Sequence, residues 1–468
     1  MSARDEIDTI CLETDGALSE LAAIARRQRE LSADIERLRR HAATITDSRT
    51  WQALELYRRA RIRSGLSGFS AMAIRASLRR RFRRRGVPPA VANAPIGVNV
   101  SGYLDAESGL GEAARASIRS LEAARIPFAL NNVPSPLRTA DATYRHAFGV
   151  DHPHPFNLVH LNSDNLPSFA ARRGPAYFKD RYTIGYWFWE LATLPEDWVL
   201  FSGYVDEVWT ATRFERDAVQ EQCNLPAIVM PLPIVLPPVP PRGRAHFGIP
   251  DGPAVFLYIF DVSSQVERKN PMAAIRAFRQ AALPRESAVL VLKFTNAEYD
   301  RASVRRLHEA AAGLNVVMLD GYLDRADLTA LMAVADCYLS PHRSEGFGMT
   351  ILEAMRLGKP AIGTNYSAVT DFMTPENSYP LDFSMVPVGR KYGPYPPTAV
   401  WAEPSIVHAA RLIREIVEHP ADAAARGSRA RADVERDRNP VATGRRVRSR
   451  LDVLQSGAAF SSPGGDGR

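Results

Sequence analysis

Two carboxylates, Glu345 and Glu353, flank a glycine-rich turn that opens a predicted helix, with seven residues between them. A helix start has backbone N–H groups without intrahelical partners and carries the positive end of the helix dipole, so it attracts phosphate groups. Gly346 and Gly348 have no Cβ and let the backbone approach a diphosphate closely. Glu353 can accept hydrogen bonds from the vicinal hydroxyls of a ribose, and we expect Glu345 to face the bound sugar. The segment therefore predicts a site for a nucleotide sugar.

The segments around this turn predict strands. Residues 331–341 have the pattern of a helix end followed by a short buried strand, and residues 360–364 have that of the next strand. The order strand, glycine turn, helix, strand places a ligand at the carboxyl edge of a parallel sheet. We therefore expect the turn to contact the donor, and the two residues before Ser344 either to contact it or to form a structural bridge to the sheet edge. The predicted contacts on this segment are His342, Arg343, Gly346, Phe347, Gly348, Met349, Thr350 and Glu353.

Further motifs follow one another in a fixed order along the chain. They are residues 109–115 (GLGEAAR), 268–271 (RKNP), 364–367 (TNYS), 371–378 (DFMTPENS) and 401–404 (WAEP). With the paired glutamates, they make the chain between Gly97 and Asp437 resemble the retaining glycosyltransferases of family 4, also called group 1 glycosyltransferases. The resemblance implies an α/β fold of the GT-B architecture, in which two Rossmann-like domains face a central cleft. Trp401, in the last of these motifs, we interpret as structural.

The resemblance also assigns roles near the diphosphate. It implies that Lys269 is directed at the diphosphate with Arg268 beside it, and that Glu345 orients the donor hydroxyls, so these three are the predicted catalytic residues. The family often has an arginine or similar group six residues before this lysine, where this chain has Ser263. We expect Arg268 or Lys293, which ends a strand, to supply the missing charge and to contact the donor.

The first domain contributes candidates of its own. Gly109 and Gly111 lie between the first predicted strand and a helix, which places their loop at the cleft. His160 ends a later strand and is either a cleft group or a histidine that only hydrogen-bonds backbone. Relatives often have a histidine at the end of strand 182–188, whereas this chain has Glu190 close by.

Three tryptophans near the end of that strand have two interpretations. They form either a stacking platform for an acceptor sugar or part of the core. These residues are Trp187, Trp189 and Trp198.

Composition excludes several classes of protein. The chain has 468 residues, of which 46% are hydrophobic and 24% charged, so it is globular and long enough for two or three domains. The three cysteines are too few for a disulfide framework, which favours a cytoplasmic protein. No apolar run reaches the ~20 residues of a membrane-spanning helix. The sequence has no D-x-D triplet, and we predict neither a metal nor a cofactor.

The N-terminal part carries two features of its own. Apolar residues spaced by three and four between residues 17 and 45 predict either a dimerising coiled coil or a helix that packs on its own chain. Eleven arginines and one acid lie between Trp51 and Ala90, so this segment holds the excess positive charge of the chain. This segment is either a solvated linker or a segment that binds the anionic inner surface of a membrane. Because the rest of the chain is nearly neutral, we predict no nucleic-acid partner.

These patterns predict a succession of parts. They are a helical segment with a possible coiled coil at 1–50, an arginine-rich segment at 51–94, a Rossmann-like acceptor domain at 95–235, a proline-rich linker at 236–250, a Rossmann-like nucleotide-sugar domain at 251–425, a closing helix at 426–455 that returns to the first domain, and a disordered tail at 456–468.

The motifs and the resemblance together imply a cytoplasmic, metal-independent, retaining glycosyltransferase of the hexosyltransferase type. It would transfer a sugar from a nucleoside-diphosphate donor to a glycan, lipid-linked or protein-linked acceptor in bacterial surface polysaccharide or glycoconjugate synthesis. One alternative is a phosphorylase or epimerase of the same architecture. The other is a non-catalytic scaffold that recruits partners through the N-terminal segments. Neither the donor nor the acceptor, nor a general base, is predicted.

Overall fold

The computed structural model describes residues 87–135 and 138–456. Both sheets and every side chain discussed below belong to one compact unit, which holds the described residues outside 167–172. The predicted coiled coil, the arginine run and the tail beyond residue 456 lie outside the described residues. No helix among the described residues is long and apolar enough to span a membrane.

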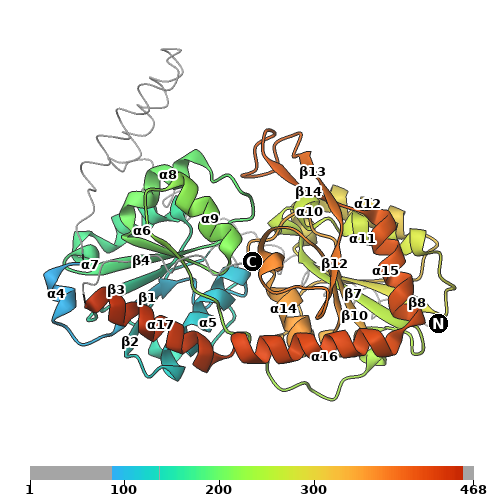
Figure 1. The fold of residues 1–468 in the computed structure, drawn as a ribbon, viewed down its shortest axis with the longest axis horizontal. Helices are drawn as coiled ribbons and strands as arrows, with labels where there is room; N and C mark the ends of the chain where they lie inside the picture. Colours follow the sequence, from blue (N-terminus) through green and yellow to red (C-terminus); the bar gives the residue numbers. More distant parts are fainter. Residues whose placement is uncertain (1–86, 136–137, 457–468) are drawn as a thin grey trace, which may run out of the picture. The chain divides into compact units, whose positions relative to one another are not determined.

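The first sheet has six parallel strands in the order β2-β1-β3-β4-β5-β6 (Figure 1). Every residue of β1, β3, β4 and β5 is buried, as expected for parallel strands with helices on both faces. These four strands were predicted, whereas the short edge strands β2 and β6 were not. The strands are β1 (Val98–Gly102), β2 (Phe128–Asn132), β3 (Phe156–His160), β4 (Tyr182–Trp187), β5 (Glu207–Thr210) and β6 (Ala227–Val229).

The helices of this part of the chain alternate with the strands. They are α4 (Pro89–Ala92), α5 (Gly109–Ala123), α6 (Leu166–Arg173), α7 (Pro175–Phe178), α8 (Glu196–Phe201) and α9 (Arg213–Gln222).

The second sheet is also parallel and has the order β12-β11-β10-β7-β8-β9. The chain winds outward from β7 in one direction and from β10 in the other, so the topological switch point lies between these two strands. In open α/β sheets, ligands bind at such a point, beside the carboxyl ends of the strands. The strands are β7 (Ala254–Asp261), β8 (Ala288–Thr295), β9 (Val316–Asp320), β10 (Cys337–Ser340), β11 (Ala361–Thr364) and β12 (Tyr379–Leu381).

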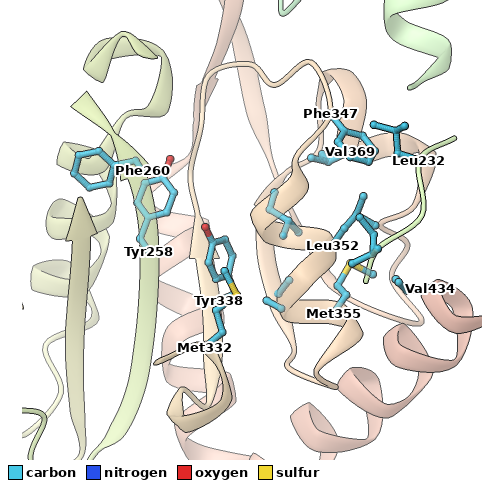
Figure 2. Close-up of a cluster of buried hydrophobic side chains, with 14 of the residues drawn as sticks. Leu232, Tyr258, Phe260, Met332, Tyr338, Phe347, Leu352, Met355, Val369 and Val434 are labelled. Carbon is cyan, nitrogen blue, oxygen red and sulfur yellow. The ribbon is translucent and has the colours of Figure 1, made fainter. Parts of the chain in front are cut away.

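Helices connect these strands and pack against the second sheet. They are α10 (Val266–Lys269), α11 (Pro271–Ala281), α12 (Arg301–Ala311), α13 (Arg325–Val334), α14 (Met349–Arg356) and α15 (Ile406–Glu418). Figure 2 shows part of this core, in which Phe347 lies near Leu232 and Val369, and Met355 of α14 lies near Val434.

A hairpin near the end of the second domain was also not predicted. Strands β13 (Phe383–Pro387) and β14 (Val400–Pro404) form an antiparallel hairpin whose connection spans residues 388–399. Trp401 of β14 is buried and lies under the guanidinium of Arg343, which confirms its structural interpretation.

The closing helix predicted at 426–455 is instead two helices, α16 (Pro420–Asp437) and α17 (Pro440–Gln455). The break has a local cause, because Pro440 has no N–H to continue a helix and the Asn439 side chain caps the new one. As predicted, α17 returns to the first domain, where it packs along α5 (Figure 1). Thr443 and Ser120 share a hydrogen bond of 2.8 Å between their hydroxyls.

A buried ion pair holds α17 in place. The Arg450 guanidinium donates two hydrogen bonds to the carboxylate of Glu207 on β5, one of them 3.0 Å long. Glu207 also accepts from the Trp209 indole at 2.7 Å. Both charged side chains are almost fully buried. Such a pair stabilises the fold only while both partners are present, because either charge alone is costly inside a protein.

We therefore expect Arg450→Met to lower the free energy of unfolding by about 3–5 kcal/mol. The control is Arg436→Met, which removes an arginine of α16 that pairs with Asp433 and Asp437 at the surface. That change should cost about 0–1 kcal/mol. Urea denaturation of the three proteins measures both values, and equal losses would contradict the role of the buried pair.

His160 is buried at the carboxyl end of β3. Its side chain is 1% exposed and its ring stacks on Tyr186, with centroids 4.7 Å apart. In the described part of the chain, neither ring nitrogen has a hydrogen-bond partner. Burial lowers the pKa of His160 to about 3, so the ring is neutral. The backbone hydrogen bond that we considered for its side chain is absent from the described residues, and its role in the cleft remains a prediction.

This burial makes stability depend on pH. Below about pH 6.5, His160 is protonated in the unfolded chain but not in the folded chain. The free energy of unfolding is therefore unaffected by this group above that pH and decreases as the pH falls below it. We expect wild type to lose about 1.4 kcal/mol per pH unit more than His160→Phe between pH 6 and 4. The phenyl ring can keep the stack on Tyr186. Urea unfolding at several pH values tests this, and parallel curves for the two proteins would refute it.

Candidate active site

The loop between β10 and α14 carries a row of unpaired backbone amides. Three of its carbonyls are bonded elsewhere, at 2.9 Å to the Arg268 guanidinium, 3.2 Å to the Ala368 amide and 3.1 Å to the Thr212 hydroxyl. These carbonyls belong, in order, to Ser344, Glu345 and Gly346. Within the described residues, four consecutive amides have no acceptor, those of Gly346, Phe347, Gly348 and Met349. Free amides at a helix start suit an anion.

The two glycines of this loop are needed for different reasons. Gly348 caps α14 with φ +78°, a left-handed conformation that favours glycine. A Cβ on Gly346 would lie 2.9 Å from Glu215 Oε1 and 3.1 Å from the carbonyl oxygen of Trp189. The absence of a side chain at Gly346 therefore lets the loop approach the first domain.

The predicted catalytic residues meet in one cluster. Lys269 Nζ lies 2.6 Å from Glu345 Oε1, and Arg268 Nη1 lies 3.3 Å from Glu345 Oε2. Burial by itself raises the pKa of Glu345, but the charges of Lys269 and Arg268 outweigh it and lower the pKa to about 2. Burial lowers the pKa of Lys269, against the opposite effect of Glu345. Glu345 is therefore ionised and tied to both cations.

Arg268 has further partners. Its Nη2 donates to the Ser264 carbonyl at 3.1 Å and lies 3.5 Å from Glu190 Oε1, while its Nε is buried without a partner within the described ranges. The hydroxyl of Ser263, at the position of the missing family cation, donates to Asp261 at 2.8 Å. Arg268 thus brings the additional positive charge to Glu345 and Glu190.

Glu353 is buried on α14 and accepts a hydrogen bond from Arg325 at the start of α13. Burial raises the pKa of Glu353, and the charge of Arg325 opposes this rise. A small cleft beside the pair is lined by residues of α5, of the chain passage after β6 and of the glycine loop. Its lining includes Glu112, Leu232, Arg325, Phe347, Met349 and Glu353.

Two predicted donor contacts have other partners. Lys293 donates to the carbonyls of Phe294 and Gly321, and burial lowers the pKa of Lys293 to about 8. Arg343 donates to Glu403 of β14 at 2.6 Å and to the Glu267 carbonyl at 2.6 Å. These contacts tie both side chains to the second domain, and their contact with a donor remains a prediction.

His342 is fully buried and shares a hydrogen bond of 3.0 Å with Ser340 through Nδ1. Its Nε2 has no partner in the described part of the chain. Burial lowers the pKa of His342 to about 4, so the ring next to the charge cluster is neutral. Thr350, in the first turn of α14, is partly exposed.

Gly109 and Gly111 do not form a free loop, because they lie in the first turn of α5. Ser108 caps this helix by accepting from the Gly111 amide at 3.2 Å. A Cβ on Gly111 would lie 2.2 Å from the Ala106 carbonyl oxygen, whereas one on Gly109 would meet nothing within 4 Å. Gly111 therefore permits close packing of the turn after β1.

The stacking platform is wrong, and the core alternative is confirmed. All three tryptophans are buried, and they pack on one another with their rings inclined, so none offers a face to a sugar. The one at the end of β4 and the one two residues beyond it both pack against the third, on α8. These residues are Trp187, Trp189 and Trp198.

Sequence reasoning missed Glu215, which supports the glycine loop from the first domain. Glu215 accepts from the amides of Trp189 at 3.2 Å and Ala211 at 3.0 Å, and lies 3.2 Å from the Thr212 hydroxyl. Burial raises the pKa of Glu215. The Thr212 hydroxyl is within donating distance of both the Glu215 carboxylate and the Gly346 carbonyl, and so links the two segments. The capping pattern Thr212-x-x-Glu215 was the available signal.

Comparison with known proteins agrees with this geometry. Residues 242–382 match the family model described as glycosyl transferases group 1. A 72-residue segment is 35% identical to the GDP-mannose-dependent alpha-(1-6)-phosphatidylinositol dimannoside mannosyltransferase of Mycobacterium tuberculosis, and covers 15% of this chain and 19% of that protein. A 61-residue segment is 43% identical to the O-antigen biosynthesis glycosyltransferase WclY of Escherichia coli, and covers 13% of this chain and 15% of that protein.

A solved structure resembles most of the fold. The crystal structure of Anabaena Alr3699/HepE in complex with UDP and glucose has a TM-score of 0.56 and 14% identity, and covers 76% of this chain and 99% of that one. The segments shared with the two curated relatives span less than a fifth of those proteins. The two six-stranded parallel sheets and this structural likeness show the GT-B fold, and residues 242–382 are similar to the group 1 glycosyltransferases.

Proposed function

We propose that the protein is a retaining glycosyltransferase that moves a hexose-type sugar from a nucleoside-diphosphate donor to a glycan, lipid-linked or protein-linked acceptor. The observation that carries the proposal is the row of free amides at residues 346–349 beside Lys269 and two buried glutamates. The match to the group 1 model supports it, as do the similarities to a GDP-mannose-dependent enzyme and to an O-antigen transferase. The latter suggests bacterial surface polysaccharide synthesis.

In this proposal the second domain holds the donor. The amides at the start of α14 and the Lys269 ammonium receive the diphosphate, because both are hydrogen-bond donors with positive charge or partial charge. Glu353 exchanges part of its contact with Arg325 for the ribose hydroxyls. Glu345, which Lys269 and Arg268 keep ionised, accepts from hydroxyls of the donor sugar.

Catalysis then consists of stabilising separated charge. The bond between the anomeric carbon and the β-phosphate oxygen breaks, the acceptor oxygen bonds to the same face of that carbon, and the acceptor proton passes to the leaving phosphate. Fixed amides and cations stabilise the developing negative charge without reorganising. Because protein groups supply this charge, the proposal requires no metal ion, and turnover in the presence of EDTA tests that part.

We expect one sugar donor from a panel of UDP-, GDP-, ADP- and dTDP-sugars to raise the melting temperature of wild type and to release its nucleoside diphosphate. Glu353→Ala should weaken donor binding about ten- to a hundredfold, since it removes hydrogen bonds to a charged group. Glu435→Ala is the matched control. Glu435 lies on α16 and pairs near the surface with Arg356, which is on the same helix as Glu353. Failure of wild type to respond to any donor would instead support the scaffold alternative.

Gly346→Ala should also weaken donor binding, by about tenfold, because the new methyl group must displace a loop that Glu215 and the Trp189 carbonyl hold from the other side. Gly109→Ala is the control, since a Cβ there meets nothing within 4 Å. Calorimetric titration with the nucleoside diphosphate measures both affinities. Unchanged affinity of the Gly346 variant would argue against the amide row as the diphosphate site.

A further inference from the structure

Glu190 is the first-domain acid in contact with the charge cluster, and its backbone is fixed there. It follows β4 by three residues. The Ser344 hydroxyl donates to its carbonyl oxygen, and the preceding amide, of Trp189, donates to Glu215. Glu190 is thus attached to the glycine loop as well as to its own domain.

The Glu190 carboxylate lies between two partners. Its Oε1 is 3.5 Å from Arg268 Nη2, and its Oε2 accepts a hydrogen bond of 2.9 Å from the Tyr395 hydroxyl. The Glu190 side chain is 23% exposed, against 10% for Glu345. Glu190 therefore combines a fixed orientation with access from outside.

Tyr395 reaches this position on the connection between β13 and β14. Its ring is 3% exposed and lies beside Trp189, with centroids 5.5 Å apart, and beside Trp401 at 6.4 Å. The same connection covers α10, because Gly393 lies against the Gln265 side chain and Arg390 is 3.6 Å from Glu267. The hairpin thus places one hydroxyl on Glu190 and covers the helix that carries Arg268.

The carboxylate retains capacity for a substrate. An ionised carboxylate accepts about four hydrogen bonds and donates none, and the two contacts described use about half of that capacity. Arg268 already balances its charge, so a further cation is not required. A hydroxyl group is the donor that fits, as Tyr395 itself demonstrates.

The domain that carries Glu190 indicates which substrate provides this hydroxyl. The free amides, Lys269 and both paired glutamates belong to the second domain, and these groups account for the donor in the proposed function. Glu190 faces the same cluster from the first domain, which supplies none of these donor-holding groups, so its free hydrogen-bonding capacity suits the other substrate, the acceptor.

We propose that Glu190 is a further substrate-contacting residue, which accepts a hydrogen bond from a hydroxyl of a sugar acceptor, and that Tyr395 is the positioning residue that orients it. This inference rests on the proposed function. It assigns the unpredicted hairpin a part in acceptor recognition.

The experiment compares wild type with Glu190→Gln, Tyr395→Phe and the control Tyr392→Phe. Tyr392 lies on the same connection and packs on Trp401 at 5.7 Å, without a contact to Glu190. For each protein, three quantities are measured with the donor found in the screen. They are affinity for the nucleoside diphosphate, hydrolysis of the donor by water, and transfer to a panel of methyl glycosides.

We expect Glu190→Gln and Tyr395→Phe to bind the nucleoside diphosphate within about twofold of wild type, and to transfer to methyl glycosides about tenfold or more slowly, mainly through a higher acceptor KM. Hydrolysis should fall much less, because water needs no orientation by Glu190. Tyr392→Phe should match wild type in all three quantities.

Other outcomes would overturn the inference. Unchanged transfer in both variants means that Glu190 touches no acceptor, and equal loss of hydrolysis and transfer places it at the donor. Loss of nucleotide affinity means a structural role. If wild type hydrolyses a donor but transfers its sugar to no glycoside, the proposal that the acceptor is a sugar is wrong. Failure of the proposed function differs from all of these, because wild type itself would then turn over no donor.

Discussion

The buried ion pairs of Glu345 with Lys269 and Arg268 are the interaction on which the site depends. Taking three charged groups out of water is costly, and their mutual attraction offsets that cost only where further hydrogen bonds complete the arrangement. Here the backbone completes it, because Ser344 and Ser264 offer their carbonyls to Arg268. The glycine loop and α10 are therefore fixed to each other through charges rather than through apolar packing.

The same cluster joins the two domains of this unit. Thr212 of the first domain, which also contacts Glu215, donates to the Gly346 carbonyl, while Ser344 of the second domain donates to the Glu190 carbonyl. These contacts turn the loop carbonyls away from the helix start and leave the amides free. An anion site made in this way needs both domains, although its donors all belong to one of them.

Local pattern predicted the central strands, since fully buried parallel strands are continuous apolar runs that any window of sequence reveals. Local pattern also predicted the helix start between the paired glutamates, because a glycine turn before an apolar helix is a local signal. The hairpin β13–β14 escaped notice because its strands are short and partly exposed, and β2 and β6 because edge strands carry little pattern.

The sequence by itself predicted the central strands, the GT-B architecture and the residues of the proposed site. Tertiary structure decided which group each of those residues meets. Tyr395 and Glu190 stand 205 residues apart, and Lys269 and Glu345 stand 76 apart. Such partners meet through the packing of segments distant in sequence, within one domain for Lys269 and Glu345 and between two domains for Tyr395 and Glu190, and local periodicity carries no signal for this. For the same reason, the sequence predicted that Gly346 lets a phosphate approach, but did not show that a Cβ at this position would also meet Glu215 and Trp189 of the other domain.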